Sequence, residues 1–578
     1  MLKNLLHKSV LGLVFSICLA PADPGSASSP AAKKDDALLS AMQQELQRAH
    51  DSLGKLDPAP YFLSYSVQDN SIALAIGSQG SLLTSTSSRR RSADVILRIG
   101  TPALDNAHAE NRSSAISSGT LPLEDDRNAI ARVLWRLTSE EYRKASRAYA
   151  NVKTSTQVHA QEEDTSPDLS QESPQTHSDY TDSGALPDQH TLENLARQFS
   201  SYLRKYPYVY NSMAMVTIER TQSHYVSSEG TQVVTPGAMV RVSVDAETRA
   251  DDGMELICVE TFQAETLEQL PPESEVAVRV EKMATDLKAL RDAPLAEPFD
   301  GPVLLSGRAT AVFFHEVLGH RLEGHRQRGE TEGQTFTKRV NQAVLPDFLS
   351  VSDDPTRRTL DGLPLSGWYE YDDEGMPAAR VDVIQNGILK NFLMSRMPIK
   401  NFDKSNGHGR FQPGLMSTGR QGNLIVSSSK TVKDSELRQK LKDEVKKQGK
   451  PYGLYFEDIQ GGFTLTQRSM PQAFQVLPVL VWRVYDRPDE LVRGVDIVGT
   501  PLAAMERILL TGDKTAVFNG ICGAESGSVP VSAAAPAMLF SDIEVQKRAH
   551  SLNRPPILPP PGFEAPEAAP PAKSGGQP

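Results

Sequence analysis

Apolar residues recur at helical spacing in four stretches of the first half of the chain, and shorter apolar runs lie between them. The helical spacing predicts amphipathic helices at 36–56, 126–149, 191–204 and 273–292. The shorter runs, bounded by turns rich in glycine and serine, predict strands at 61–67, 72–76, 93–99, 213–218, 239–244 and 254–262. This mixture predicts an N-terminal α/β domain at 23–295 whose strands are antiparallel.

The pattern changes near residue 296, because strands dominate from there on. They are expected at 302–306, 380–385, 387–394, 423–427, 453–458, 474–485 and 537–545, with helices only at 435–448 and 501–510 beyond the helix discussed below. The sequence therefore predicts an α+β fold, in which a mixed α/β N-terminal domain precedes a β-rich C-terminal domain at 296–553. The chain of 578 residues is too long for one ordinary core, which agrees with two domains.

The first 22 residues have the features of a secretory signal. Lys3 and Lys8 precede an apolar run at 10–20, and Ala20-Pro21-Ala22 is an A-x-A cleavage pattern. The run is too short to span a membrane, and no later stretch is long and apolar enough. We therefore predict a signal peptide at 1–22 and a mature protein without a membrane span outside the cytoplasm, in the periplasm. An uncleaved anchor is the alternative.

Two further segments have no periodic pattern. Residues 151–190 are rich in Ser, Thr, Gln, Asp and Glu, which predicts a solvated polar insert or linker. Residues 554–578 are rich in proline and alanine and are predicted to be a disordered tail.

Charge and motif content exclude several functional classes. The net charge is −11, so the chain has no general basic face for nucleic acid. Neither a GxGxxG loop nor a GxxxxGK[ST] loop is present, which argues against nucleotide chemistry.

The stretch at 311–328, AVFFHEVLGHRLEGHRQR, contains candidate metal ligands. His315 and His320 could hold a metal, and Glu316 beside them could take a proton from bound water. On a regular helix, however, residues at i and i+5 point about 140° apart and lie roughly 7.5 Å apart along the axis. The helix must therefore widen, as in a π-type turn, or bend, and Gly319 would ease that distortion. The alternative is a buried helix with two ordinary polar histidines.

The three cysteines are too few for a disulfide framework. Removal of the signal leaves Cys258 and Cys522, which could form one disulfide or remain two thiols. Cys258 lies in an apolar run and is typical of a small core residue in a strand. Cys522 is flanked by glycines, which predicts a loop, and an unpaired thiolate there indicates a chemical use.

Four segments together resemble one known family. They are EPFDGPVLLSGRATAVFFHEVLGHRLEG at 297–324, DDEG at 372–375 with VIQNGILKNFL at 383–393, RGVDIVGTPLAAMERI at 493–508, and CGAESGSVPVSAAAPAMLF at 522–540. In these segments the sequence resembles the TldD/PmbA family of metallopeptidases, and it retains the HExxxH motif of the active members. The segment at 416–423 follows the family's Arg- and Asn-bearing pattern only in part.

The resemblance implies a zinc site in which His315, His320 and Cys522 are the ligands and Glu316 is the catalytic carboxylate. Two imidazoles and one thiolate leave the fourth tetrahedral position open for water, as a catalytic zinc site requires. His325 is the local rival for the third ligand.

Glu323 has two interpretations at this stage. Its carboxylate could orient a ligand histidine, or it could form a surface salt bridge with Arg326 or Arg328.

The resemblance also implies a zinc-dependent peptidase that hydrolyses unfolded or short peptides by metal-activated water. It implies a homodimer, or a heterodimer with a family paralogue, that encloses the metal site. Family members of this type are commonly cytosolic, so the apparent export signal is a departure. The alternatives are a non-catalytic peptide-binding or processing partner and a zinc hydrolase of another amide bond.

Overall fold

The computed structural model describes residues 36–158, 164–181, 185–329, 331–469, 474–549 and 559–563. The predicted signal peptide at 1–22 and most of the predicted tail at 554–578 lie outside the described residues. Among the residues described, no helix is both long and apolar enough to cross a membrane.

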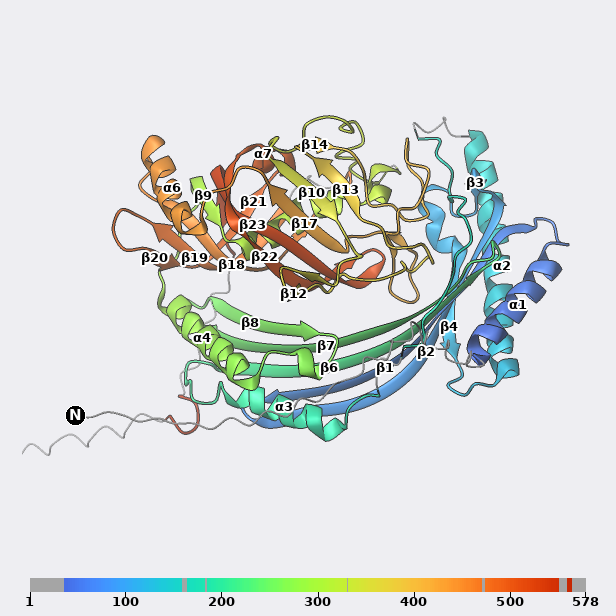
Figure 1. Ribbon diagram of the computed structural model, residues 1–578, viewed down its shortest axis with the longest axis horizontal. Helices are drawn as coiled ribbons and strands as arrows, with labels where there is room; N and C mark the ends of the chain where they lie inside the picture. Colours follow the sequence, from blue (N-terminus) through green and yellow to red (C-terminus); the bar gives the residue numbers. More distant parts are fainter. Residues whose placement is uncertain are drawn as a thin grey trace, which may run out of the picture.

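The N-terminal domain is built on an eight-stranded sheet with the order β3-β2-β1-β6-β7-β5, in which β4 also pairs with β2 and β8 with β7. Four long antiparallel strands form its centre. They are β1 (Pro60–Ser78), β2 (Ser81–Thr101), β6 (Asn211–Ser227) and β7 (Gln232–Arg249). The shorter strands are β3 (Leu104–Asp105), β4 (Ile116–Leu121), β5 (Thr176–Ser178) and β8 (Glu255–Ala264). The long strands curve beneath the C-terminal domain (Figure 1).

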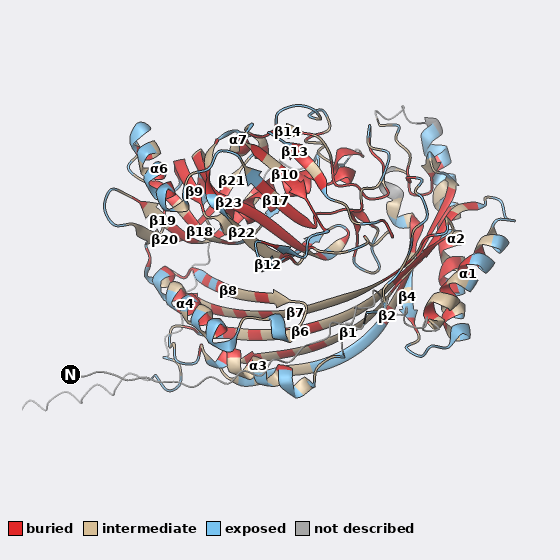
Figure 2. Ribbon diagram, in the orientation of Figure 1, coloured by how far each residue is buried: buried red, intermediate tan, exposed pale blue. Residues whose placement is uncertain are grey.

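Helices cover both ends of this curved sheet. At one end, α1 (Ala37–Leu53) and α2 (Arg127–Val158) pack on it, and at the other end α3 (Gln189–Ser201) and α4 (Glu273–Asp292) do so (Figure 1). Two short 3₁₀ helices, η1 (Ala109–Ala115) and η2 (Leu267–Gln269), complete the domain. Buried and part-exposed residues alternate in the first half of β6 and the second half of β7, as expected where one face packs on helices (Figure 2).

The C-terminal domain contains an eleven-stranded sheet, part of which closes on itself. The order β9-β18-β19-β21-β23 returns to β9, because β23 also pairs with β9. The ring strands are β9 (Phe299–Leu305), β18 (Gly453–Thr464), β19 (Phe474–Val484), β21 (Val495–Gly499) and β23 (Gly527–Lys547). The same sheet includes β10 (Leu349–Asp353), β13 (Val381–Gln385), β14 (Ile388–Leu389), β17 (Asn423–Ser428), β20 (Glu490–Val492) and β22 (Ile508–Ala524).

Smaller elements surround this sheet. Two short hairpins pair β11 (Thr359–Leu360) with β12 (Leu363–Pro364) and β15 (Gly409–Arg410) with β16 (Thr418–Gly419). The helices are α5 (Gly307–Val317), α6 (Asp434–Lys447) and α7 (Pro501–Glu506), with 3₁₀ turns η3 (Gly319–Leu322) and η4 (Gly324–Gln327).

The helix α5 is buried on all sides, and it fixes where His315 lies. Every residue from Ala309 to Val317 is buried, the polar His315 and Glu316 included. Its start is capped by Ser306, whose hydroxyl accepts a hydrogen bond from Ala309 N at 3.1 Å. Further along, the Phe313 ring packs edge-on against rings from β19 and β23, with centroids 5.5 and 5.4 Å away. These contacts hold the helix against the ring of strands.

The α+β fold predicted from the sequence is confirmed. Several details differ, and one of them is the strand expected at 387–394, of which only β14 (Ile388–Leu389) forms. The runs at 61–67 and 72–76 belong to the single strand β1, because its polar middle pairs with β2 on one side and β6 on the other. The helix expected at 501–510 ends at Glu506, and the long strand β22 follows it, where the apolar pattern had indicated none.

The prediction of a solvated insert at 151–190 is wrong for parts of that segment. Helix α2 continues into it as far as Val158, and β5 pairs with β7. Between these elements Asp168 is buried, and its carboxylate accepts a hydrogen bond from Arg328 Nη2 at 2.9 Å. A polar residue can be buried when a partner satisfies it, and composition alone does not reveal which residues have such partners. Residues 159–163 and 182–184 lie outside the described residues.

Candidate metal centre

The end of α5 brings the two histidines of the HExxxH motif together. The α-helix stops after Val317, and the chain continues as the 3₁₀ turn η3, which contains His320. The rings of His315 and His320 then lie 4.9 Å apart, centroid to centroid, at 73°. The sequence had predicted a widened or bent helix. The distortion is instead a change to tighter 3₁₀ winding, which alters the direction of the second side chain.

Gly319 is required by space at this break. A Cβ at this position would lie 1.9 Å from Gln421 Oε1, far closer than any real contact. Gln421 occupies that position because its Nε2 donates a hydrogen bond to the carbonyl of His315 at 3.3 Å. The glycine therefore allows a side chain from a distant segment to hold the end of α5.

The third member of the group, Cys522, comes from a distant part of the chain. Its Sγ lies 3.4 Å from His320 Nε2. The ligand atoms of His315, His320 and Cys522 all lie within 4.8 Å of one another, and all three residues are buried. The expectation of a loop was wrong, because Cys522 lies in β22 and pairs with Val529 of β23. The glycines around it are strand residues leading to the tight turn of that hairpin.

The electrostatics of this group favour a thiolate. Burial raises the pKa of the Cys522 thiol, but His320 and His315 outweigh burial and hold that pKa well below its usual value. Burial lowers the pKa of His315, but Cys522 outweighs it and the net shift is upward. A metal cation that binds a thiolate and two imidazoles displaces the protons that these groups hold.

The donor set fits a metal ion. Two imidazoles and one thiolate match the ligands of catalytic zinc sites that leave one position open. In addition, the buried Nδ1 of His315 has no hydrogen-bond partner among the described residues. A buried polar atom left without a partner indicates a group missing from the site.

Glu323 lies behind His320 and is completely buried. Its Oε1 accepts a hydrogen bond from His320 Nδ1 at 3.1 Å, and its Oε2 accepts one from Arg326 Nε at 2.7 Å. Burial raises the pKa of Glu323, but the charges of His320 and Arg326 outweigh burial and lower it to about 2. Of the two interpretations of Glu323, orientation of a ligand histidine agrees with this geometry, and the pair with Arg326 is not a surface contact.

Glu316 is buried next to the same group. Its Oε2 lies 3.9 Å from His320 Nε2. Gly462 of β18 passes beside it, and a Cβ there would lie 2.9 Å from Glu316 Cγ. The strand therefore leaves room for the Glu316 carboxylate to reach the metal centre.

His325, the rival ligand, is not brought into this group. Its Nε2 contacts the carboxylate of Glu525, and these two residues cluster with Glu323. Arg326 pairs with both carboxylates of this second cluster, because it donates to Glu323 and, through Nη2, to Glu525 Oε2 at 3.0 Å. The described contacts of this cluster are those of an ion-pair network.

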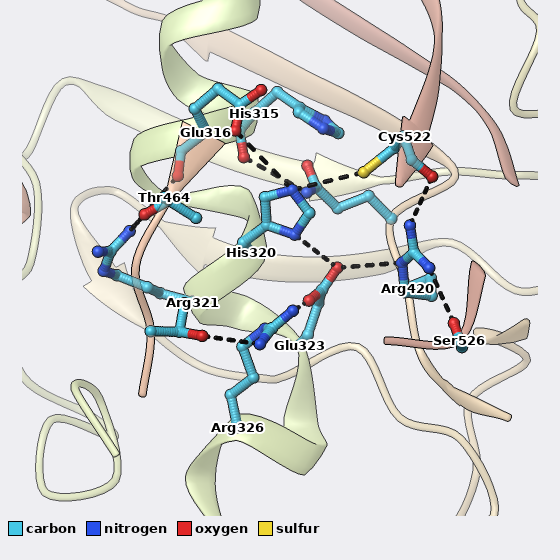
Figure 3. A network of polar contacts seen from close by, with 12 residues as sticks. His315, Glu316, His320, Arg321, Glu323, Arg326, Arg420, Thr464, Cys522 and Ser526 are labelled. Carbon is cyan, nitrogen blue, oxygen red and sulfur yellow. Dashed lines mark hydrogen bonds and ion pairs between the residues drawn. The ribbon is translucent and has the colours of Figure 1, made fainter. Parts of the chain in front are cut away.

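Three residues of the centre were not singled out by sequence reasoning. Arg420, Gln421 and Glu525 contact the ligand-bearing segments (Figure 3 shows Arg420 beside Cys522). The signal that could have found the first two is their place in the segment 416–423, which partly follows a family pattern. Glu525 lies three residues after Cys522, but a single exposed-looking acid gives no local signal.

Comparison with known proteins agrees with the resemblance. Residues 299–547 match the family model described as the PmbA/TldA metallopeptidase C-terminal domain. Over these residues the chain is similar to the TldD/PmbA family. A "Metalloprotease TldD homolog" of Buchnera aphidicola is 26% identical over 249 residues, which are 42% of this chain and 47% of the relative. A "Metalloprotease" of Archaeoglobus fulgidus is 27% identical over 238 residues, or 41% and 51% of the two chains.

A "Zinc metalloprotease TldD homolog" of Saccharolobus solfataricus is 25% identical over 327 residues, which are 56% of this chain and 68% of the relative. The match to the first two relatives covers about half of their length. Among solved structures, TldE of Thermococcus kodakarensis superposes with a TM-score of 0.57 at 14% identity, over 88% of this chain and all of that one. A Thermotoga maritima structure superposes with a TM-score of 0.58 at 16% identity, over 87% and 99%. At these identities the likeness concerns the fold.

Proposed function

We propose that this chain is a zinc-dependent peptidase that hydrolyses peptide bonds in unfolded or short peptides. One observation carries the proposal: the buried group of His315, His320 and Cys522, whose ligand atoms lie within 4.8 Å of one another, with Glu316 beside it. Two imidazoles, a thiolate and a neighbouring carboxylate are what metal-assisted hydrolysis requires. The names of the curated relatives, which are metalloproteases, support the same reaction class.

The three ligand residues would hold the zinc. When bound, zinc supplies Lewis-acid polarisation of the substrate carbonyl and makes a water molecule acidic at neutral pH. The chain contributes the orientation of the ligands. A carboxylate can only accept, so the bond to Glu323 fixes the proton of His320 on Nδ1. The other ring nitrogen, Nε2, faces Cys522 Sγ, 3.4 Å away, and would be the atom that binds the metal once a proton there is displaced.

Glu316 is the proton carrier in this proposal. Its carboxylate takes the proton of the attacking water and returns it to the leaving amine. The position of Glu316 supports this role, because it shares α5 with His315 and therefore moves with the ligand group.

The substrate, partner and compartment are proposals of the same account. An extended peptide bound along a strand edge would present its carbonyl groups in a regular row, which suits an unfolded or short substrate. We also propose a dimer of two copies or with a family paralogue, which the fold likeness to TldE supports. The signal-like residues at 1–22 support a periplasmic location.

The test is hydrolysis by the zinc-loaded chain and by Glu316→Gln. A panel of unfolded proteins, short peptides and small amides is incubated with each, and mass spectrometry identifies the bonds that are cut. We expect peptide-bond cleavage by the wild type and a loss of about 100-fold or more in Glu316→Gln, the usual effect of removing a general base. Unchanged function in Glu316→Gln would favour a non-catalytic peptide-binding partner, and cleavage of small amides alone would favour a different zinc hydrolase.

A further inference from the structure

Arg420 is completely buried beside the hairpin that supplies Cys522. Its Nη2 donates a hydrogen bond to the carbonyl of Cys522 at 2.8 Å. Its Nη1 donates to Ser526 Oγ at 2.8 Å and to the carbonyl of Gly527 at 2.9 Å. One guanidinium thus contacts the hairpin at the ligand residue and on the far side of its turn (Figure 3).

The same guanidinium faces the histidine side of the centre. Its Nε lies 3.6 Å from Glu323 Oε1, the oxygen that accepts the hydrogen bond from His320 Nδ1 at 3.1 Å. At 3.6 Å this is a charge contact rather than a hydrogen bond. Arg420 therefore stands between the carboxylate that orients His320 and the backbone that carries Cys522.

Such a link is needed because the ligands come from separate parts of the fold. His320 follows α5, whereas Cys522 lies 202 residues later, two residues before the end of β22. A metal site tolerates errors of only about 0.5 Å in the positions of its ligands. The rigid planar fork of an arginine can fix several acceptors of the hairpin at once.

A buried arginine is itself costly unless its charge and its N–H groups are satisfied. Here the charge faces Glu323, and the hairpin supplies three oxygen acceptors. Nε of Arg420 has no hydrogen-bond partner among the described residues and faces only the charge of Glu323, so loss of either part of the centre would leave the buried guanidinium less well compensated.

We propose that Arg420 is a positioning residue that sets Cys522, and through Glu323 also His320, at the spacing a zinc ion requires. This inference rests on the proposed function, because it assumes that the group binds zinc. Arg326 also contacts this hairpin, through Glu525, but the Glu525 side chain is 42% exposed. The contact between Arg326 and Glu525 is therefore weaker than the contacts of Arg420 with the hairpin.

The test measures metal affinity rather than hydrolysis. Zn²⁺ dissociation constants are determined by chelator competition for the wild type, Arg420→Gln, Arg420→Lys and Glu525→Gln, and Co²⁺ spectra report the thiolate–metal bond. We expect a Kd raised about 10- to 100-fold in Arg420→Gln with a weaker thiolate–cobalt band, in the range found when outer-shell partners of metal ligands are removed. Arg420→Lys should recover only part of the affinity, since one ammonium cannot reproduce the fork. Glu525→Gln should change Kd less than Arg420→Gln.

Arg396 provides a matched control. It is also a buried arginine, and its Nη2 donates to Ser170 O at 2.6 Å and to Glu229 Oε1 at 2.9 Å, away from the metal centre. Arg396→Gln should lower the unfolding temperature and leave the Zn²⁺ Kd within about threefold. Should Arg420→Gln not fold, Ser526→Ala decides the matter, because it removes one acceptor without altering the charge and should raise Kd several-fold.

The possible outcomes separate the inference from the function on which it rests. A folded Arg420→Gln with wild-type Kd and cobalt spectrum overturns the inference alone, and so does a folded Ser526→Ala with wild-type Kd if Arg420→Gln does not fold. A wild type that binds no zinc overturns the proposed function and the inference with it. A wild type that binds zinc but cuts no peptide overturns the function and leaves the Arg420 result standing.

Discussion

Glu323 Oε1 lies 3.1 Å from His320 Nδ1, and both side chains are buried. This contact fixes one histidine of the HExxxH motif in a single orientation and tautomer. A carboxylate behind a ligand imidazole also raises the basicity of that ligand. The candidate metal centre therefore includes a contact to a residue three positions beyond the motif.

Replacement of Glu323 tests this dependence. Glu323→Ala is expected to raise the Zn²⁺ Kd about 10- to 100-fold, as is usual when the outer partner of a metal-binding histidine is lost. Glu323→Gln keeps an acceptor oxygen and should lose less. Chelator competition measures both, with Glu436→Gln on the exposed face of α6 as the control. Equal affinities in Glu323→Ala and wild type would show that the contact has no role in metal binding.

Gly319→Ala tests the close approach of Gln421. The added Cβ would lie 1.9 Å from Gln421 Oε1, so either Gln421 or η3 must move. We expect a loss of about 1–3 kcal/mol in the free energy of unfolding, as for other overpacked sites, together with weaker zinc binding. Urea unfolding provides the measurement.

Gly461→Ala is the matched control for this prediction, because a Cβ there meets nothing within 4 Å. The double variant Gly319→Ala/Gln421→Ala should recover part of the lost stability, since the clashing amide is gone. Additive effects of the two substitutions would contradict the steric explanation.

Asp168 tests whether the polar segment at 151–190 is a structural part of the protein. Its carboxylate is buried and bonded to Arg328 Nη2 and to Asp105 N, each at 2.9 Å. Asp168→Asn leaves the Arg328 charge without its counter-ion, which costs about 3–5 kcal/mol for a buried pair. The variant should unfold at lower urea concentration. A change under 1 kcal/mol would mean that this segment is only loosely attached.

Glu141, which lies away from the metal centre, should make the stability of the protein depend on pH. Burial raises its pKa to about 7, although Ser117 and Lys144 lower it in part. The folded pKa exceeds the ordinary value of 4.5, so the folded state favours the protonated acid. The contribution of the protonated Glu141 carboxyl to the free energy of unfolding is fully present below pH 4.5 and is lost as the pH rises through about 7.

The variant Glu141→Gln cannot ionise and should lack this decline. The difference in unfolding free energy between Glu141→Gln and wild type should therefore grow from pH 4.5 to pH 7 and then level off. A difference that is constant over this range would refute the assignment. Urea unfolding at a series of pH values gives the comparison directly.

Particular residues show which features of the fold and the site can be predicted from the sequence alone. His315, Glu316 and His320 form a local motif, and Cys522 stood out because it is flanked by glycines in a segment that resembles the family. The α+β fold followed from the apolar periodicity. These features are local in sequence, so a pattern can reveal them.

Other features depend on contacts between distant segments and leave no local pattern. Gln421 reaches Gly319 only because β16 leads it past the end of α5. The β22 strand around Cys522 is rich in small residues, and its pairing with β23 makes it a strand. The polar centre of β1 is likewise a strand because it has two neighbours. The change from α to 3₁₀ winding after Val317 was expected only as some distortion.

The measurement that tests the central claim most directly is the zinc content of the purified chain beside Cys522→Ser. The account predicts about one zinc per chain in the wild type and a large loss in the variant, because the thiolate is one of only three protein ligands. Zinc fully retained in Cys522→Ser would contradict the assignment of Cys522 and bring His325 back as a ligand. A wild type that takes up no zinc when it is supplied would contradict the metallopeptidase account as a whole.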